Sequence, residues 1–109
     1  MNIPGVVNVD GKKYAVKKIG TAAFKGCEAL QSVIIGKNVV AIGAKAFEGD
    51  KKLKKITISG SALKKIGKNA MKDIDPNAAI IVSRNGKQKI AKQLTKRIGY
   101  LSTMKLKSK

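Results

Sequence analysis

The amino-acid sequence predicts a repeat solenoid, mostly β with some α structure, that coils about three times. An apolar-Ile-Gly-Ala-apolar phrase recurs about every 23 residues, a period typical of stacked repeats. Later in each repeat, apolar residues occupy every second position, as they do in a strand with one buried face. Aromatic residues make up 4% of the chain, so the core is expected to be aliphatic. The phrase reads Val16-x-x-Ile19-Gly20-x-x-Ala23-Phe24, then Val39-x-x-Ile42-Gly43-x-x-Ala46-Phe47, then Leu63-x-x-Ile66-Gly67-x-x-Ala70-Met71.

Residues 1–18 are predicted to form an N-terminal hairpin cap. Val6–Val9 and Tyr14–Val16 have strand composition, and Asp10-Gly11 between them is a hairpin turn signal. The terminal coil of a solenoid otherwise leaves an apolar face in water. We therefore expect the hairpin to cover the open end of the first coil.

Residues 19–83 are predicted to hold the repeats. The Ile-Gly pair indicates a short extended piece and a bend, because glycine fits where a side chain would clash. The Ala-apolar pair after it is expected to point inward, so that Phe24, Phe47 and Met71 stack as one ladder. A longer strand with one buried face follows in each repeat, marked by Val33 and Ile35, Ile56 and Ile58, and Ile80 and Val82.

Residues 84–101 are predicted to form a C-terminal capping helix. Lys87 to Ile98 carries apolar residues at helical spacing, and Gly99 is placed as a helix stop. Contact with an anionic membrane surface is the alternative use of the helix's apolar stripe. Residues 102–109 are lysine-rich and are predicted to be a mobile basic tail. All four segments are assigned to one domain.

Composition argues against most catalytic chemistry. The chain has no histidine, which removes the commonest general base and metal ligand. Its one cysteine, Cys27, is expected to be a small buried apolar residue. We therefore predict no enzyme activity, no cofactor, and no catalytic or metal site. No apolar run reaches the roughly 18 residues that span a bilayer, and the first residues lack the pattern of a secretory signal.

Two of the repeats resemble a known family. The segment from Ile19 to Ile35 resembles the BspA-like leucine-rich repeat, and Ile42 to Ile58 matches nearly as well, with Asp50 where that family usually has cysteine. The resemblance covers about Val16 to Val82. It implies a right-handed solenoid with strands on a concave face and a non-enzymatic role. It also implies a bacterial protein at the cell surface or secreted, although the missing export signal leaves a cytoplasmic location open.

Two surfaces are candidate binding sites. The predicted ligand face comprises strand residues that point outward and their neighbours, namely Ser32, Ile34, Lys54, Lys55, Thr57, Ala79 and Ile81. The predicted basic flank comprises lysines that recur beside the Ile-Gly phrase, namely Lys17, Lys18, Lys64 and Lys65. A purely solvated lysine surface is the plain alternative for both.

These surfaces lead to two functional hypotheses. The first is a monomeric module for adhesion or protein–protein interaction that uses the concave face and the basic flank. The second follows from the net charge of +18, which attracts polyanions such as acidic glycan, teichoic acid or nucleic acid. Sequence-specific reading of nucleic acid is disfavoured, because the chain has only two arginines and few aromatic residues.

Overall fold

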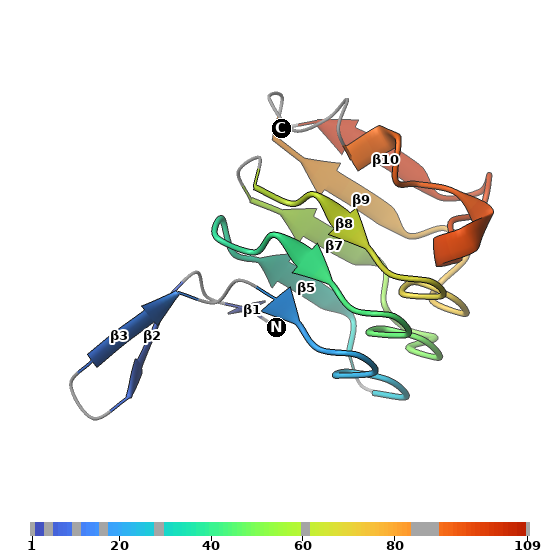
Figure 1. The fold of residues 1–109 in the computed structure, drawn as a ribbon. Coiled ribbons are helices and arrows are strands. Elements are labelled where there is room, and N and C mark those ends of the chain that lie inside the picture. Colours follow the sequence, from blue (N-terminus) through green and yellow to red (C-terminus); the bar gives the residue numbers. More distant parts are fainter. Residues whose placement is uncertain are drawn as a thin grey trace.

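The protein is a β-solenoid in which successive coils stack their strands in parallel (Figure 1). The computed structural model describes residues 2–3, 6–9, 12–15, 18–27, 30–59, 62–83 and 90–108. Its largest sheet is parallel and has five strands, in the order β1 (Asn2–Ile3), β5 (Ser32–Ile35), β7 (Lys55–Ile58), β9 (Ala79–Val82) and β10 (Lys105–Ser108).

A second, narrower sheet runs along the coils. It is formed by two-residue strands that carry the isoleucine of the Ile-Gly phrase, in the order β4 (Lys18–Ile19), β6 (Ala41–Ile42) and β8 (Lys65–Ile66). Equivalent residues of the repeats lie opposite one another in both sheets, as Ile19, Ile42 and Ile66 do. The predicted solenoid of about three coils, with one longer and one shorter strand in each, is therefore confirmed.

The core fills the space enclosed by the coils. On the longer strands, residues of one parity point inward, and Val33, Ile56 and Ile80 are completely buried. The aromatic rings of Phe24 and Phe47 stack with centroids 5.6 Å apart and planes 6° from parallel. The buried strand residues confirm the aliphatic core, and the stacked rings confirm the contact predicted between Phe24 and Phe47. Met71 is completely buried, as are Ala46 and Ala70. Ala23 is exposed, so the prediction that the Ala of each phrase points inward is wrong for the first coil.

The glycines of the second and third phrases are required by the coil that precedes each of them. A Cβ atom at Gly43 would lie 2.6 Å from the Thr21 nitrogen, and one at Gly67 would lie 2.4 Å from the Ala44 nitrogen. A Cβ atom at Gly20 would meet nothing within 4 Å. The glycine therefore allows close coil stacking, which explains why it recurs with the period of the coil.

The N-terminal hairpin exists, but a different strand pairs with the first coil. β2 (Val6–Val9) and β3 (Lys12–Ala15) pair antiparallel in a two-stranded sheet of their own. Figure 1 shows this hairpin directed away from the coils. The edge of the large sheet is instead covered by β1, which places Asn2 opposite Ile34. The prediction that the hairpin covers this edge was wrong, because the edge of a parallel sheet is satisfied by one more parallel strand.

The predicted capping helix does not run to Ile98. Residues 84–89 of that prediction lie outside the described residues, and helical structure after them is limited to Ile90 and Ala91. Thr95 is extended, with φ −128° and ψ 170°, and a 3-10 helix, η2 (Lys96–Ile98), follows it. Tertiary hydrogen bonds outweigh the helical pattern here, since the Ile98 carbonyl accepts a bond of 2.7 Å from the Met71 amide. Gly99 does end a helix, the 3-10 helix, in a left-handed conformation.

The expected mobile tail is a strand. β10 pairs in parallel with β9 over four residues, with Leu106 opposite Ile80. Met104, just before β10, is 4% exposed and belongs to the core. The C-terminal segment thus forms a fourth coil's strand in the large sheet. The prediction of a mobile tail at residues 102–109 was therefore wrong. An apolar pair at strand spacing inside a lysine-rich segment was the signal for it.

Candidate functional site

The first candidate surface, the strand face, is the outward side of the large sheet. The strand register sets two rows of side chains across it. One row consists of Ser32, Lys55, Ala79 and Lys105, and the other of Ile34, Thr57, Ile81 and Lys107. Six of the seven residues predicted for the ligand face stand in these rows. Lys105 and Lys107 were missed, because their segment was predicted to be a mobile tail.

The second row is apolar in its centre. Ile34 is 45% exposed, which is unusual for a large hydrophobic side chain. Thr57 is 7% exposed and lies between Ile34 and Ile81 in the register. The row ends on the exposed Lys107. The strand face therefore combines the exposed apolar surface of Ile34 with positive charge from Lys55 in the first row and from β10 at one side.

Lys54 does not belong to these rows. It precedes β7, and its backbone continues the ladder, since its amide donates to the Gln31 carbonyl at 2.9 Å. Neighbouring residues of an extended chain point to opposite sides. Lys54 is exposed, but it has the parity of the buried Ile56 and not that of Lys55.

The second candidate surface, the basic groove, follows the narrow sheet. Lys18 and Lys65 stand in register on β4 and β8, with Ala41 of β6 between them. Lys64 is exposed beside this row, and its carbonyl accepts a hydrogen bond of 2.9 Å from the Gln93 side chain. Lys17 lies outside the described residues. The structure thus brings together the described members of the predicted basic flank.

A groove of about 460 Å³ lies against this row. The described residues of its lining include no acidic side chain, and small residues such as Gly43 and Ala44 form part of it. Arg97 joins the lining from the fourth coil, and its guanidinium contacts the Ile66 carbonyl at 3.4 Å. Sequence reasoning missed Arg97 because it expected that residue on a continuous helix. The basic groove is lined by four cations, Lys18, Lys65, Lys68 and Arg97.

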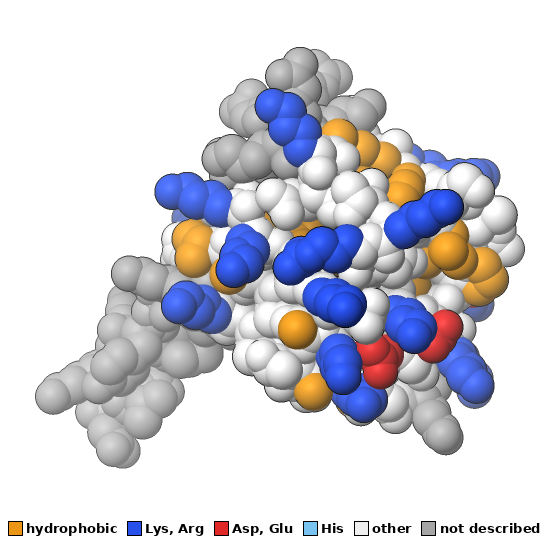
Figure 2. Space-filling view, turned by 45° about the vertical axis from the view of Figure 1, so that its right-hand side comes forward, with side chains coloured by type: hydrophobic (Ala, Val, Ile, Leu, Met, Phe, Trp, Pro, Cys, Tyr) orange, Lys and Arg blue, Asp and Glu red, His pale blue; other side chains and the backbone are white. Residues whose placement is uncertain are grey.

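Charge is unevenly distributed over the side of the molecule where the turns gather. Figure 2 shows Lys and Arg side chains spread widely over this side, whereas acidic side chains occur at the lower right of the view. Such a surface attracts anionic partners and speeds their approach.

Cys27 is tied to the neighbouring coil by a buried carboxyl. It is half-buried and packs against the core, and its amide donates to Oδ1 of Asp50 at 2.7 Å. Asp50 is completely buried, and its Oδ2 atom has no hydrogen-bond partner in the described structure. Burial raises the pKa of Asp50, although the amides of Cys27 and Gly26 oppose the shift. Asp50 stands where the resemblance leads one to expect cysteine.

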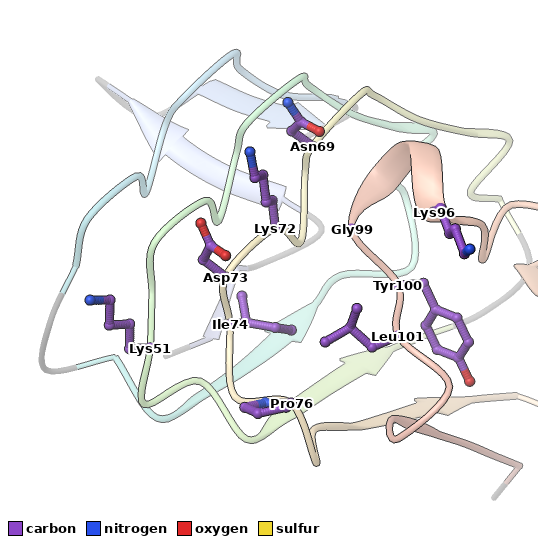
Figure 3. Close-up of a pocket in the computed structure, with 10 residues that line it drawn as sticks. All are labelled: Lys51, Asn69, Lys72, Asp73, Ile74, Pro76, Lys96, Gly99, Tyr100 and Leu101. Carbon is purple, nitrogen blue, oxygen red and sulfur yellow. The ribbon is translucent and has the colours of Figure 1, made fainter.

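A cavity of about 820 Å³ lies between the third turn and the fourth coil (Figure 3). Ile74, Pro76 and Leu101 contribute apolar surface to it. Figure 3 shows Ile74 and Leu101 directed toward one another. This end cavity is lined by Lys51, Asn69, Lys72, Asp73, Ile74, Pro76, Lys96, Gly99, Tyr100 and Leu101.

Other kinds of site find no support in the described residues. Nowhere in this part of the chain do three His, Cys, Asp or Glu side chains gather closely enough to hold a metal ion. Within the same residues, no helix has the length and apolar character needed to cross a membrane.

Comparison with known proteins decides the family. The sequence model of the BspA type leucine rich repeat region (6 copies) matches residues 10–109. The chain belongs to the BspA-type leucine-rich repeat family. The family match extends beyond the resemblance seen in the sequence, which ended near Val82, and it includes the fourth coil with β10. No curated protein and no solved structure gave a match.

Membership gives these surfaces a general meaning. A BspA-type leucine-rich repeat is a binding module of the kind used in protein–protein interaction. In a BspA-type coil the buried positions are consumed by stacking. Among the described surface residues, those of the strand face, the basic groove and the end cavity are the candidates for contact with a partner.

Proposed function

We propose that this protein is a non-enzymatic binding module that holds a protein partner against its strand face. The observation that carries the proposal is the in-register row on the outward side of the large sheet, in which Ile34, 45% exposed, and Ile81 lie on either side of Thr57. Lys105 and Lys107 flank that row on β10. The matching partner surface has an apolar centre with acidic residues beside it.

The rigidity of the sheet supports this choice. Four parallel strands hold the two rows at fixed spacing of about 4.8 Å from strand to strand. A partner therefore meets preordered side chains, and binding costs little conformational entropy on this side. The absence of histidine from the sequence agrees with a role that needs no general base. By family, we place the protein at the cell surface or outside the cell, with a cytoplasmic location as the alternative.

The test compares neighbouring lysines. The partner is first identified by probing an array of immobilised matrix proteins and anionic glycans at two salt concentrations. We expect Ile34→Ala to weaken binding to the identified protein about tenfold, and Lys55→Glu to weaken it by a similar factor.

Lys54→Glu is the matched control for this experiment. It makes the same change of charge one residue away, at a position outside the two rows. We expect its effect to be less than about threefold. Equal losses for Lys54→Glu and Lys55→Glu, together with unchanged binding by Ile34→Ala, would discard the strand face.

The basic groove favours a second candidate function, the binding of a linear polyanion. Lys18, Lys65 and Arg97 come from three different coils, so they can contact successive charges of one chain. The small residues between them let an anionic group approach the backbone. Nucleic acid would be bound without sequence specificity, because the described residues of the lining include no aromatic side chain on which a base could stack.

A further inference from the structure

The end cavity exists because the fourth coil is short. In the third coil, the stretch from Ala70, whose carbonyl bonds the coil below, leads to the strand residue Ala79. The equivalent stretch of the fourth coil leads from Ile98 to Lys105 and is two residues shorter. The shorter path passes over the core but does not cover the end of the third turn. This difference leaves the end cavity beside Asp73 and Ile74.

Two amides at this end of the third turn have lost their partners. In the first coil the Gly26 amide donates to the Glu48 carbonyl, and in the second the Gly49 amide donates to the Lys72 carbonyl, both at 2.9 Å. Asp73 is the third-coil equivalent, and its φ of 61° matches those of Gly26 and Gly49, 71° and 80°. Among the described residues, neither its amide nor that of Ile74 has a hydrogen-bond acceptor.

The first coil shows what these amides bind when an acceptor is present. The Cys27 amide, which is equivalent to that of Ile74, donates to Oδ1 of the Asp50 carboxylate at 2.7 Å. The Gly26 amide, which is equivalent to that of Asp73, donates to the Glu48 carbonyl of the same neighbouring coil. In the first turn both amides thus bind oxygen acceptors, one of them a carboxylate. Hydrogen bonds from an amide to an ionised carboxylate are strong, so a ligand that supplies a carboxylate to the two amides of the third turn gains affinity.

The residues around the two amides indicate which chemical groups the ligand carries besides its carboxylate. Leu101 is 46% exposed and faces Ile74 in the cavity (Figure 3). Lys51, Lys72 and Lys96 stand around the opening, against the single carboxyl of Asp73. The Asp73 side chain is directed away from Leu101 in this view. An anion with an attached apolar group satisfies both features.

We propose that the end cavity binds a carboxylate carried on a small apolar residue, with its oxygens on the amides of Asp73 and Ile74. The apolar group lies against Leu101 and Pro76. The source is an acidic side chain or the chain terminus of a protein. This site shares no residue with the strand face, so it stands or falls independently of the function proposed above.

The experiment is a titration of the full chain followed by its backbone amide NMR signals. One probe is acetyl-Leu-Leu with a free terminal carboxylate, and a second is acetyl-Leu-Asp-Leu-amide, whose carboxylate is on the side chain. Acetyl-Leu-Leu-amide is the uncharged control. We expect saturable shifts of the Asp73 and Ile74 amides with the acids, with dissociation constants on the order of 1 mM, and none with the control. The tighter of the two acids identifies the source.

Two variants test the assignment of the contacts. Leu101→Ala should weaken binding of the acid probes about fivefold, whereas Ile34→Ala, an equally exposed apolar residue elsewhere, should leave it unchanged. Asp73→Asn should strengthen binding about twofold, because it removes a nearby like charge and asparagine tolerates the positive φ. The NMR spectrum of each variant also reports its fold. Equal shifts with the acids and the uncharged control, or no saturable shift at Asp73 and Ile74, would overturn the proposal.

Discussion

At the scale of the residue, Asp50 shows how coil stacking tolerates a buried acid. Its carboxyl replaces a packing group with an acceptor for the Cys27 amide of the first coil. The amides of Cys27 and Gly26 offset part of the cost of burying the charged form. They do not offset all of it, because Oδ2 has no partner in the described structure and the pKa of the carboxyl is raised. Asp50 thus serves the fold, and it lies outside the surfaces available to a ligand.

The raised pKa of Asp50 predicts a specific pH dependence. The folded protein binds the Asp50 proton more tightly than the unfolded chain, so the free energy of unfolding falls as the pH rises from the ordinary value of 3.8 through the raised pKa. Asp50→Asn does not titrate. We expect the wild type to lose stability relative to this variant as the pH rises above 3.8. Urea unfolding at several pH values measures the difference, and parallel curves would refute the buried carboxyl.

At the scale of the element, β10 extends the large sheet into a segment that the sequence analysis had placed outside the solenoid. A lysine-rich segment pairs along β9, while Met104 and Leu106 turn toward the core. Its lysines face outward and join the rows of the strand face. The lysines also protect an edge strand from pairing with other chains. The lysine content of the segment therefore reflects only the outward side of β10, and its apolar residues reflect the side that packs on the core.

Substitutions before β10 distinguish a packed strand from a mobile tail. Met104→Ala should lower the free energy of unfolding by about 2–5 kcal/mol, because it removes a side chain that is 4% exposed. Leu101→Ala, three residues earlier and 46% exposed, should cost less than about 1 kcal/mol. Urea denaturation of the two variants gives both values. Similar small losses for both would restore the mobile tail.

At the scale of the whole molecule, the net charge of +18 influences every surface. Long-range attraction brings polyanions to any part of the protein, whereas a defined groove holds them at one place. The two cases differ in whether the position of a lysine on the surface affects the binding of a polyanion. Total charge alone makes all exposed lysines equivalent, and the basic groove makes a few of them dominant.

Heparin binding separates these two cases. We expect retention on a heparin column to weaken steeply with salt, as counterion release requires. The double variant Lys65→Gln, Lys68→Gln should elute at clearly lower salt than Lys37→Gln, Lys54→Gln, which loses the same charge at exposed positions outside the groove. Identical elution of the two variants would leave net charge as the only cause. Retention no stronger than that of a neutral protein would remove the polyanion function.

Sequence analysis predicted a large part of the fold and less of the candidate sites. The repeat, its buried residues and the Phe24–Phe47 stack followed from periodicity. So did the outward placement of six of the seven residues predicted for the ligand face, whose role in binding stays a prediction. Lys105, Lys107 and Arg97 were missed because they lie where the repeat pattern weakens. The end cavity was missed as well, since nothing in the composition of residues 98–105 reveals that the coil is two residues shorter.

By itself, the sequence determined the period of the coil, its family and the side of each strand that is buried. These properties depend on local chemistry repeated at fixed spacing, which is visible in one dimension. Only the tertiary structure decided which strand covers the first coil, where the last helix stops and how the C-terminal segment is used. Those choices depend on hydrogen bonds between distant residues, such as that from the Met71 amide to the Ile98 carbonyl, and such bonds outweigh the helical preference of a short segment.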